Sequence, residues 1–72
     1  MPKLPTVSGK QVIKIAQKLG FQIIRQRGSH VILRNAERTR IVIPVHNVLK
    51  PGTLLQLLKT LNISKEKFEE LL

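Results

Sequence analysis

The chain has 72 residues, enough for one small domain, and 42% of them are hydrophobic, enough to build a core. It has no Cys, which excludes a disulfide framework and a Cys-based zinc site. Thirteen Lys and Arg against four Asp and Glu give a net charge of +9. That charge favours a polyanionic partner such as nucleic acid, with solubility alone as the other explanation.

The charge is uneven along the chain, because residues 51–72 hold three Lys and three Glu and the whole net charge falls in residues 1–50. The first seven residues, which include two prolines, are expected to form an extended arm before a single domain over residues 8–72. They lack the apolar stretch of a signal peptide, and no segment approaches the ~20 apolar residues of a membrane span. We therefore expect a cytoplasmic protein with no membrane contact.

A helix is predicted after Ser8, because Ser8 and Gln11 have the spacing of a capping box. Apolar residues follow at helical spacing, and Gly20 is a typical residue to end a helix. Lysines at every fourth position share the opposite face: Lys10, Lys14 and Lys18. This face is either simply solvated or in contact with RNA phosphates.

Three short strands are predicted next, over residues 21–26, 30–35 and 40–45. A turn that contains Gly28 joins the first two, and a polar loop over residues 35–39 joins the last two. Because these connections are too short for crossovers, the sheet should be antiparallel.

Alternation along the strands predicts two different faces. If Arg34 lies opposite Arg40 across the second hairpin, residues of like parity lie together. One face is then wholly apolar and must meet the helices. The other face is open and semi-polar, and it carries His30, Ile32, Arg34, Arg40, Val42, Pro44 and His46.

A second helix is predicted from Pro51 to about Asn62, with a wide stripe of leucines. Ser64 should cap a short last helix, from which Phe68 reaches the core. The predicted class is α+β, with an α-β-β-β-α order and two helices on one face of a three-stranded antiparallel sheet, plus the short C-terminal helix. This is the arrangement of double-stranded RNA-binding domains.

Several kinds of chemistry are poorly supported by the residues. The four glycines fit no phosphate-binding loop, and three of the four acids lie in the last seven residues. A carboxylate cluster for a metal is therefore not expected, and no cofactor is expected either. The two aromatic residues, Phe21 and Phe68, are better placed in the core than as stacking platforms for single-stranded bases.

Histidine remains as a candidate catalyst. His30 follows the Gly28 turn at the start of the middle strand, and histidine readily takes or gives a proton near neutral pH. RNA supplies its own nucleophile, the 2′-hydroxyl, so a single base can start attack on the adjacent phosphorus while cations stabilise the developing charge. Arg25, Arg27 and Arg34 are the local cations. A purely structural His30 is the alternative.

His46 is the only other imidazole and shares the parity of His30. With Arg34 opposite Arg40, His30 lies opposite Pro44, and His46 lies one step further along the third strand. Diagonal neighbours of this kind stand about 7–8 Å apart, which could span a phosphate. His46 is therefore either a second catalyst, a phosphate contact or a structural residue that bonds to backbone.

Five motifs resemble the HicA family, also called YcfA-like, over nearly the whole chain: residues 8–13, 19–21, 25–30, 43–46 and 49–54. The most specific are Gly28-Ser29-His30 and Lys50-Pro51-Gly52-Thr53. HicA proteins are small toxins of prokaryotic toxin–antitoxin pairs. One departure is Val31, where many relatives have a second His.

The resemblance implies a fold like that of double-stranded RNA-binding domains and metal-independent cleavage of mRNA. It implies His30 as the catalytic residue and a HicB antitoxin that covers the active site. For the RNA contacts we single out Lys10, Lys14, Arg25, Arg27, Ser29 and Arg34, with Gly28 in the turn. Two rival functions stay open: a non-catalytic basic RNA-binding module, and an interaction protein for an acidic partner. Sequence-specific DNA binding is not expected.

Overall fold

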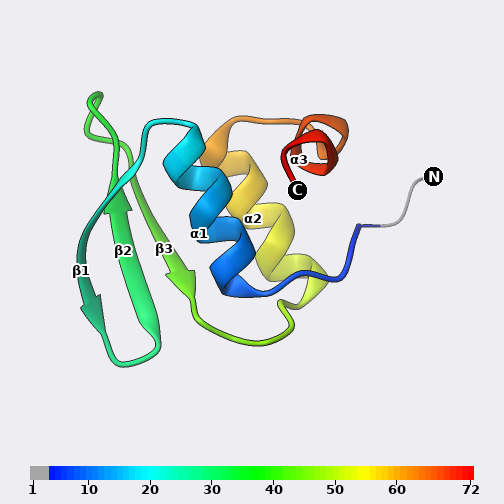
Figure 1. Ribbon diagram of the computed structural model, residues 1–72, viewed down its shortest axis with the longest axis horizontal. Coiled ribbons are helices and arrows are strands. Elements are labelled where there is room, and N and C mark those ends of the chain that lie inside the picture. The colour runs from blue at the N-terminus through cyan, green and yellow to red at the C-terminus, as the bar shows by residue number, and fades with distance from the viewer. Residues whose placement is uncertain (1–3) are drawn as a thin grey trace.

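The computed structural model describes residues 4–72, so the first three residues of the predicted arm lie outside it. The elements in chain order are α1 (Gly9–Lys18), β1 (Gln22–Arg27), β2 (His30–Arg34), β3 (Arg40–Pro44), α2 (Pro51–Leu61) and α3 (Lys65–Leu71) (Figure 1). This confirms the predicted α+β class and its α-β-β-β-α order with a short C-terminal helix.

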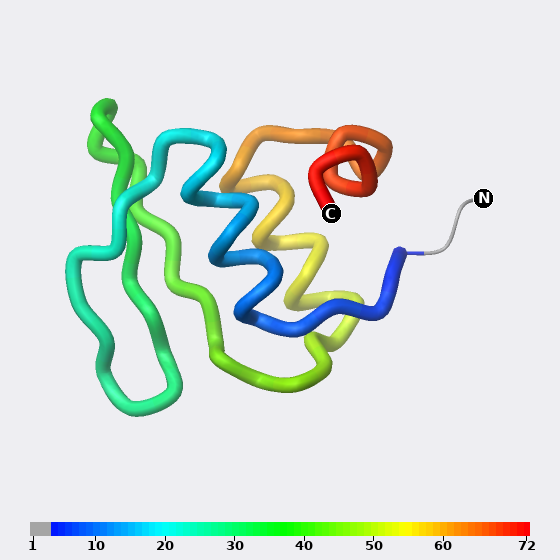
Figure 2. The backbone as a smooth tube through the Cα atoms, in the orientation of Figure 1, coloured from blue at the N-terminus to red at the C-terminus, as the bar shows by residue number. Residues whose placement is uncertain are grey.

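The molecule has a sheet layer and a helix layer. The strands are antiparallel in the order β1-β2-β3, and both α1 and α2 contact β3. Figure 2 shows α1 and α2 beside the sheet, with the C-terminal turn on the side of these helices that is away from the sheet. Lys18 Nζ donates a hydrogen bond of 3.2 Å to the carbonyl oxygen of Leu71, which ties that turn to the end of α1. No helix among residues 4–72 has the length and apolar character needed to cross a membrane.

The predicted helix signals are confirmed. Ser8 and Gln11 form a full capping box at the start of α1, and Gly20 has a φ of 97° just after its end. Pro51 stands in the first turn of α2. Asn62 ends α2 in the left-handed conformation, with a φ of 58°.

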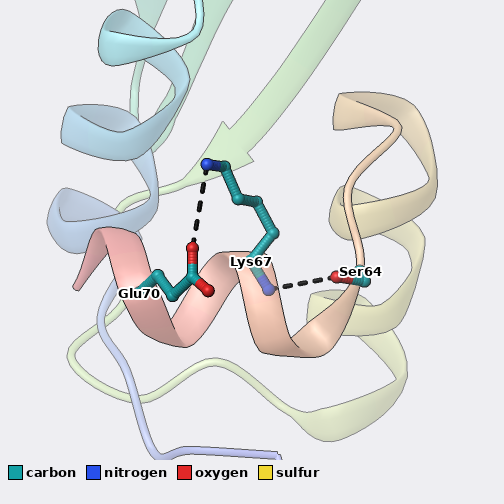
Figure 3. Close-up of polar contacts among 3 residues, drawn as sticks. All are labelled: Ser64, Lys67 and Glu70. Atoms are coloured by element: carbon teal, nitrogen blue, oxygen red, sulfur yellow. Dashed lines mark hydrogen bonds and ion pairs between the residues drawn. The ribbon is translucent and has the colours of Figure 1, made fainter.

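The last helix is held by an N-terminal cap and by packing against the core. Ser64 Oγ accepts a hydrogen bond of 3.0 Å from the Lys67 backbone N–H, as Figure 3 shows. Lys67 Nζ lies 3.8 Å from Glu70 Oε2, but both side chains are exposed and such a pair adds little stability. Phe68 is fully buried in the core and Leu71 packs against the core, so these two side chains and the Lys18–Leu71 bond hold α3 against the rest of the fold.

The register of the second hairpin is the predicted one, with Arg34 opposite Arg40 and His30 opposite Pro44. The face toward the helices is apolar and buried, through Val31, Leu33, Ile41 and Ile43. The N–H of Val45 bonds to Ser29 O and that of Asn35 bonds to Thr39 O, so the odd-numbered pairs are the hydrogen-bonded ones. Pro44 therefore falls in a non-hydrogen-bonded pair, where its missing N–H costs no ladder bond.

Two details of the sheet differ from a simple alternation. The register of β1 shifts between Ile23 and Arg25, so Ile24 is the extra residue of a β-bulge. On the open face, Ile32 is only 4% exposed, although it lies outside the core between the helices and the sheet. Its cross-strand neighbours are Arg25 and Val42, whose side chains flank it. The centre of the open face is thus apolar.

Candidate functional site

A groove of about 460 Å³ at one edge of the sheet contains both histidines. β2 and β3 supply one wall, and the segment that leads into α2 supplies the other. Its principal residues are His30, Val42, Pro44, His46, Lys50 and Thr53. Both imidazoles are exposed, so the groove can admit a ligand to either of them.

The turn before β2 determines the position of His30. Gly28 has a φ of 56°, a conformation that a residue with a β-carbon rarely adopts, and its carbonyl oxygen accepts a hydrogen bond of 2.9 Å from Gln26 Nε2. His30 follows as the first residue of β2, with Arg27 directly opposite it on β1. Ser29 acts through its backbone, because its carbonyl oxygen accepts the N–H of Val45 at 2.6 Å.

His46 lies just past the end of β3, in the segment that leads to α2. Its carbonyl oxygen accepts a hydrogen bond of 2.9 Å from the N–H of Gly9, the first residue of α1. Further along, the N–H of Leu49 donates to Val7 O at 2.9 Å. These two bonds hold the segment against the start of α1, while the exposed imidazole of His46 stays free to line the groove.

The predicted arginines form successive rows on the open face. Arg27 pairs with His30, Arg25 pairs with Ile32, and Arg34 lies at the far end of β2. Because Arg34 is four residues from His30 along one strand, it lies about 13 Å away. All three arginines are exposed, so they are available to a ligand that crosses this face.

The predicted lysines on α1 lie apart from the groove. The residues of α1 that face the sheet are buried and apolar, whereas Lys10 and Lys14 are exposed on the opposite side. Neither of them lines the groove, and Lys14 instead borders a hollow next to Leu71 and Leu72. The helix layer therefore separates these lysines from the open face of the sheet.

A comparison with protein-family models matches residues 9–63 to the family described as "HicA toxin of bacterial toxin-antitoxin". The chain belongs to the HicA toxin family. The match runs from the first residue of α1 to the residue before the Ser64 cap of α3, so it includes the whole sheet and the groove. Membership supports a role as the toxin of a toxin–antitoxin pair, which implies an antitoxin partner. A search of curated proteins gives no match.

Lys50 and Thr53 are groove residues that the sequence did not single out as site residues. Both belong to the Lys-Pro-Gly-Thr motif, which resembles the HicA family and predicts the start of α2. Lys50 is the N-cap residue of α2 and is exposed, and Thr53 is half-buried in the first turn. The signal was therefore present, as a cation directly before a helix.

The groove of this HicA chain has proton-transfer and anion-binding groups but no carboxylate. Glu37 stands in the loop between β2 and β3, and the three other acids are on α3. Among residues 4–72, no three His, Asp or Glu side chains gather as a metal site would require. Two imidazoles, an ammonium and nearby guanidinium groups suit a phosphate-containing ligand and proton transfer to or from it.

Proposed function

We propose that this HicA toxin is an endoribonuclease that cleaves mRNA without a metal, with His30 as the catalytic base. The observation that carries the proposal is the groove itself, which joins His30 with His46 and Lys50, while Arg27 lies opposite His30 on the neighbouring strand β1. An exposed imidazole among cations, with no carboxylate beside it, suits a reaction on a phosphodiester whose nucleophile belongs to the substrate.

In the proposed reaction, His30 removes the proton of a ribose 2′-hydroxyl. The 2′-oxygen forms a bond to the adjacent phosphorus, and the bond from phosphorus to the 5′-oxygen of the next nucleotide breaks. The leaving oxygen takes a proton from water or from His46, which yields a 2′,3′-cyclic phosphate and a 5′-hydroxyl. Negative charge grows on the phosphate oxygens during this step, and Arg27 and Lys50 are the nearest candidates to stabilise it.

The remaining RNA contacts follow from the same arrangement. Arg25 and Arg34 continue the cationic surface from Arg27 across the open face, and Gly28 and Ser29 form the turn beside His30. Lys10 and Lys14 belong to the other side of α1, so a contact with RNA there would require a strand that wraps around the molecule. We assign Lys10 and Lys14 a smaller contribution to RNA binding than the arginines of the open face.

The proposed partner is a HicB antitoxin that covers His30 and its basic rim in the cytoplasm, where mRNA is translated. A net charge of +9 favours an acidic partner surface. We regard residues 8–72 as one toxin domain, since Val12, Leu49 and Phe68 all join the same core.

A non-catalytic RNA-binding module is the second candidate, because the arginines of the open face would bind RNA whether or not His30 reacts. The two functions separate in one experiment. Purified protein is incubated with a long RNA in excess EDTA, alongside His30→Ala. The endoribonuclease proposal predicts that the unchanged protein cleaves the RNA and that His30→Ala does not. The loss should be at least as large as the ~10²–10⁴-fold typical of one acid–base group.

Circular dichroism and thermal melting show whether His30→Ala keeps its fold, which is expected for an exposed side chain. Cleavage by folded His30→Ala at the rate of the unchanged protein would refute the assignment of the catalytic residue. Steeply salt-dependent RNA binding with no cleavage by either protein would favour the binding module.

A further inference from the structure

Arg34 and Arg40 are direct cross-strand partners at the end of the sheet far from His30. Because the odd-numbered pairs carry the hydrogen bonds, this pair is of the non-hydrogen-bonded kind, in which the α-carbons are only about 4.5 Å apart and the side chains are closest. Both residues are exposed. The two guanidinium groups therefore project from adjacent positions on the open face.

This pair is unfavourable for the isolated chain, since like charges directly opposite each other destabilise a sheet. No acid offsets them: within residues 4–72 the ion pair that forms is Lys67–Glu70 on α3. Glu37 is in the adjoining loop but makes no ion pair with either arginine. An anion bound between the two guanidinium groups would relieve the repulsion.

We propose that Arg34 and Arg40 form a clamp for a backbone phosphate of the RNA, remote from the phosphate that is cleaved. This inference rests on the proposed function and extends it by one binding subsite, to which Arg40 is a new contributor. The two guanidinium groups offer forked donors that match the oxygens of a phosphate. The clamp lies about 13 Å from His30, so it would hold a different nucleotide from the one that reacts.

The surface between the clamp and the groove supports an RNA path. Arg25 lies in the one row between them and Arg27 lies opposite His30, so each row from Arg34 to His30 carries a cation. Single-stranded nucleic acid is generally bound in positively charged tracks that follow its backbone. Beside Arg34, a hollow of about 240 Å³ is bordered by Gln22, Ile24 and Asn35, which gives a base next to the clamped phosphate both polar and apolar neighbours.

The clamp is tested by binding, so that the result does not depend on cleavage. The probe is a uniformly 2′-O-methylated RNA of about 12 nucleotides, which lacks the 2′-hydroxyl nucleophile and covers the range of common single-strand sites. Arg40→Gln is compared with Lys59→Gln, which removes one positive charge from an exposed position on α2. Arg40→Gln should weaken binding by about fivefold and reduce the slope of log Kd against log salt by about 0.7, the value for one phosphate contact on a single strand. Lys59→Gln should change neither.

Two further readings separate a clamp from a structural pair. Arg40→Gln should melt no lower than the unchanged protein, because it removes a repulsion. In cleavage of a dinucleoside monophosphate, whose single phosphate is the reacting one, Arg40→Gln should leave the rate unchanged, whereas it should raise the KM for the long RNA. A loss of binding without cleavage by any form would support the clamp and refute the proposed function.

The clamp is overturned if Arg40→Gln binds the RNA as tightly as Lys59→Gln does. This holds also if Arg40→Gln weakens the binding of an acidic protein but not that of RNA. It is also overturned if Arg40→Gln lowers the melting temperature, or if it slows cleavage of the dinucleoside as much as that of the long RNA.

Discussion

Gly9 packs against the carbonyl oxygen of Pro44 so closely that a β-carbon at position 9 would overlap it. This contact joins the first turn of α1 to the end of β3, and the N–H of Gly9 also bonds to His46 O. The helix can approach the strand only because residue 9 has no side chain. The position of His46, and with it one wall of the groove, depends on this approach.

Gly9→Ala should therefore destabilise the protein, by about 1–3 kcal/mol as overpacking typically does. The obstacle is backbone, from Pro44 and Val45, so no side-chain rotation can relieve it. Chemical denaturation of Gly9→Ala measures the loss. Gly52→Ala is the matched control, because nothing lies within 4 Å of a β-carbon at Gly52, which is in the first turn of α2. Equal stability of the two variants would contradict the role given to the Gly9 contact.

Most of the fold could be predicted because its signals are local. The capping box of Ser8 and Gln11, the Gly20 stop and the Asn62 stop are each read from a few neighbouring residues. The strict alternation of apolar residues along β2 and β3 excludes one-residue slips, which would turn the apolar side chains outward, and the pairing of Arg34 with Arg40 is a register that keeps the inner face apolar.

The features that could not be predicted from the sequence depend on contacts between distant segments. The bulge at Ile24 arises in an edge strand whose six residues are all exposed, so no buried face fixes its alternation. Lys50 and Thr53 reach the His30 groove because the backbone of Gly9 and Val7 holds residues 46–49. No sequence pattern within residues 46–53 predicts these backbone hydrogen bonds to Gly9 and Val7.

A substrate with one 2′-deoxyribose tests the proposed chemistry at the atom that matters. If the 2′-oxygen is the nucleophile, an RNA that lacks this oxygen at the cleavage position should be inert there and still bind. Cleavage of the unmodified RNA should persist in excess EDTA and leave a 2′,3′-cyclic phosphate, which mass spectrometry of the fragments identifies. Dependence on added Mg²⁺, or cleavage at the deoxy position, would overturn the mechanism.

Hydrogen exchange can locate the antitoxin on the toxin surface. An acidic antitoxin that covers His30 and its basic rim should slow exchange within residues 28–34, and the clearest change is expected at the Gly28–Ser29 turn. The segment over residues 46–48 borders the same groove and should respond as well. Protection confined to residues 64–72, on α3, would count against masking of the groove and would indicate a different interface.

The variant His46→Ala tests whether the second imidazole takes part in the reaction. In-line cleavage benefits from an acid that protonates the leaving 5′-oxygen on the side opposite the base. His46 lines the same groove as His30, so a phosphate between them is geometrically allowed. Its backbone, however, already has a structural task, because its carbonyl oxygen accepts the N–H of Gly9. That bond survives in His46→Ala, so the variant removes the imidazole and leaves the segment in place.

We expect His46 to contact phosphate and water to protonate the leaving oxygen. His46→Ala should then lower the cleavage rate by less than ~10²-fold, well short of the loss in His30→Ala, since one phosphate contact is worth less than the essential base. Single-turnover cleavage of the same RNA by both variants, with matched thermal melting, measures the difference. A substrate whose leaving group is better than a 5′-oxygen provides the control, because its cleavage needs no acid. His30→Ala, which lacks the base, should cleave this activated substrate as slowly as it cleaves the RNA. If His46→Ala and His30→Ala lose cleavage of the RNA equally, and the activated substrate restores His46→Ala alone, then His46 is the acid and the single-histidine mechanism is wrong.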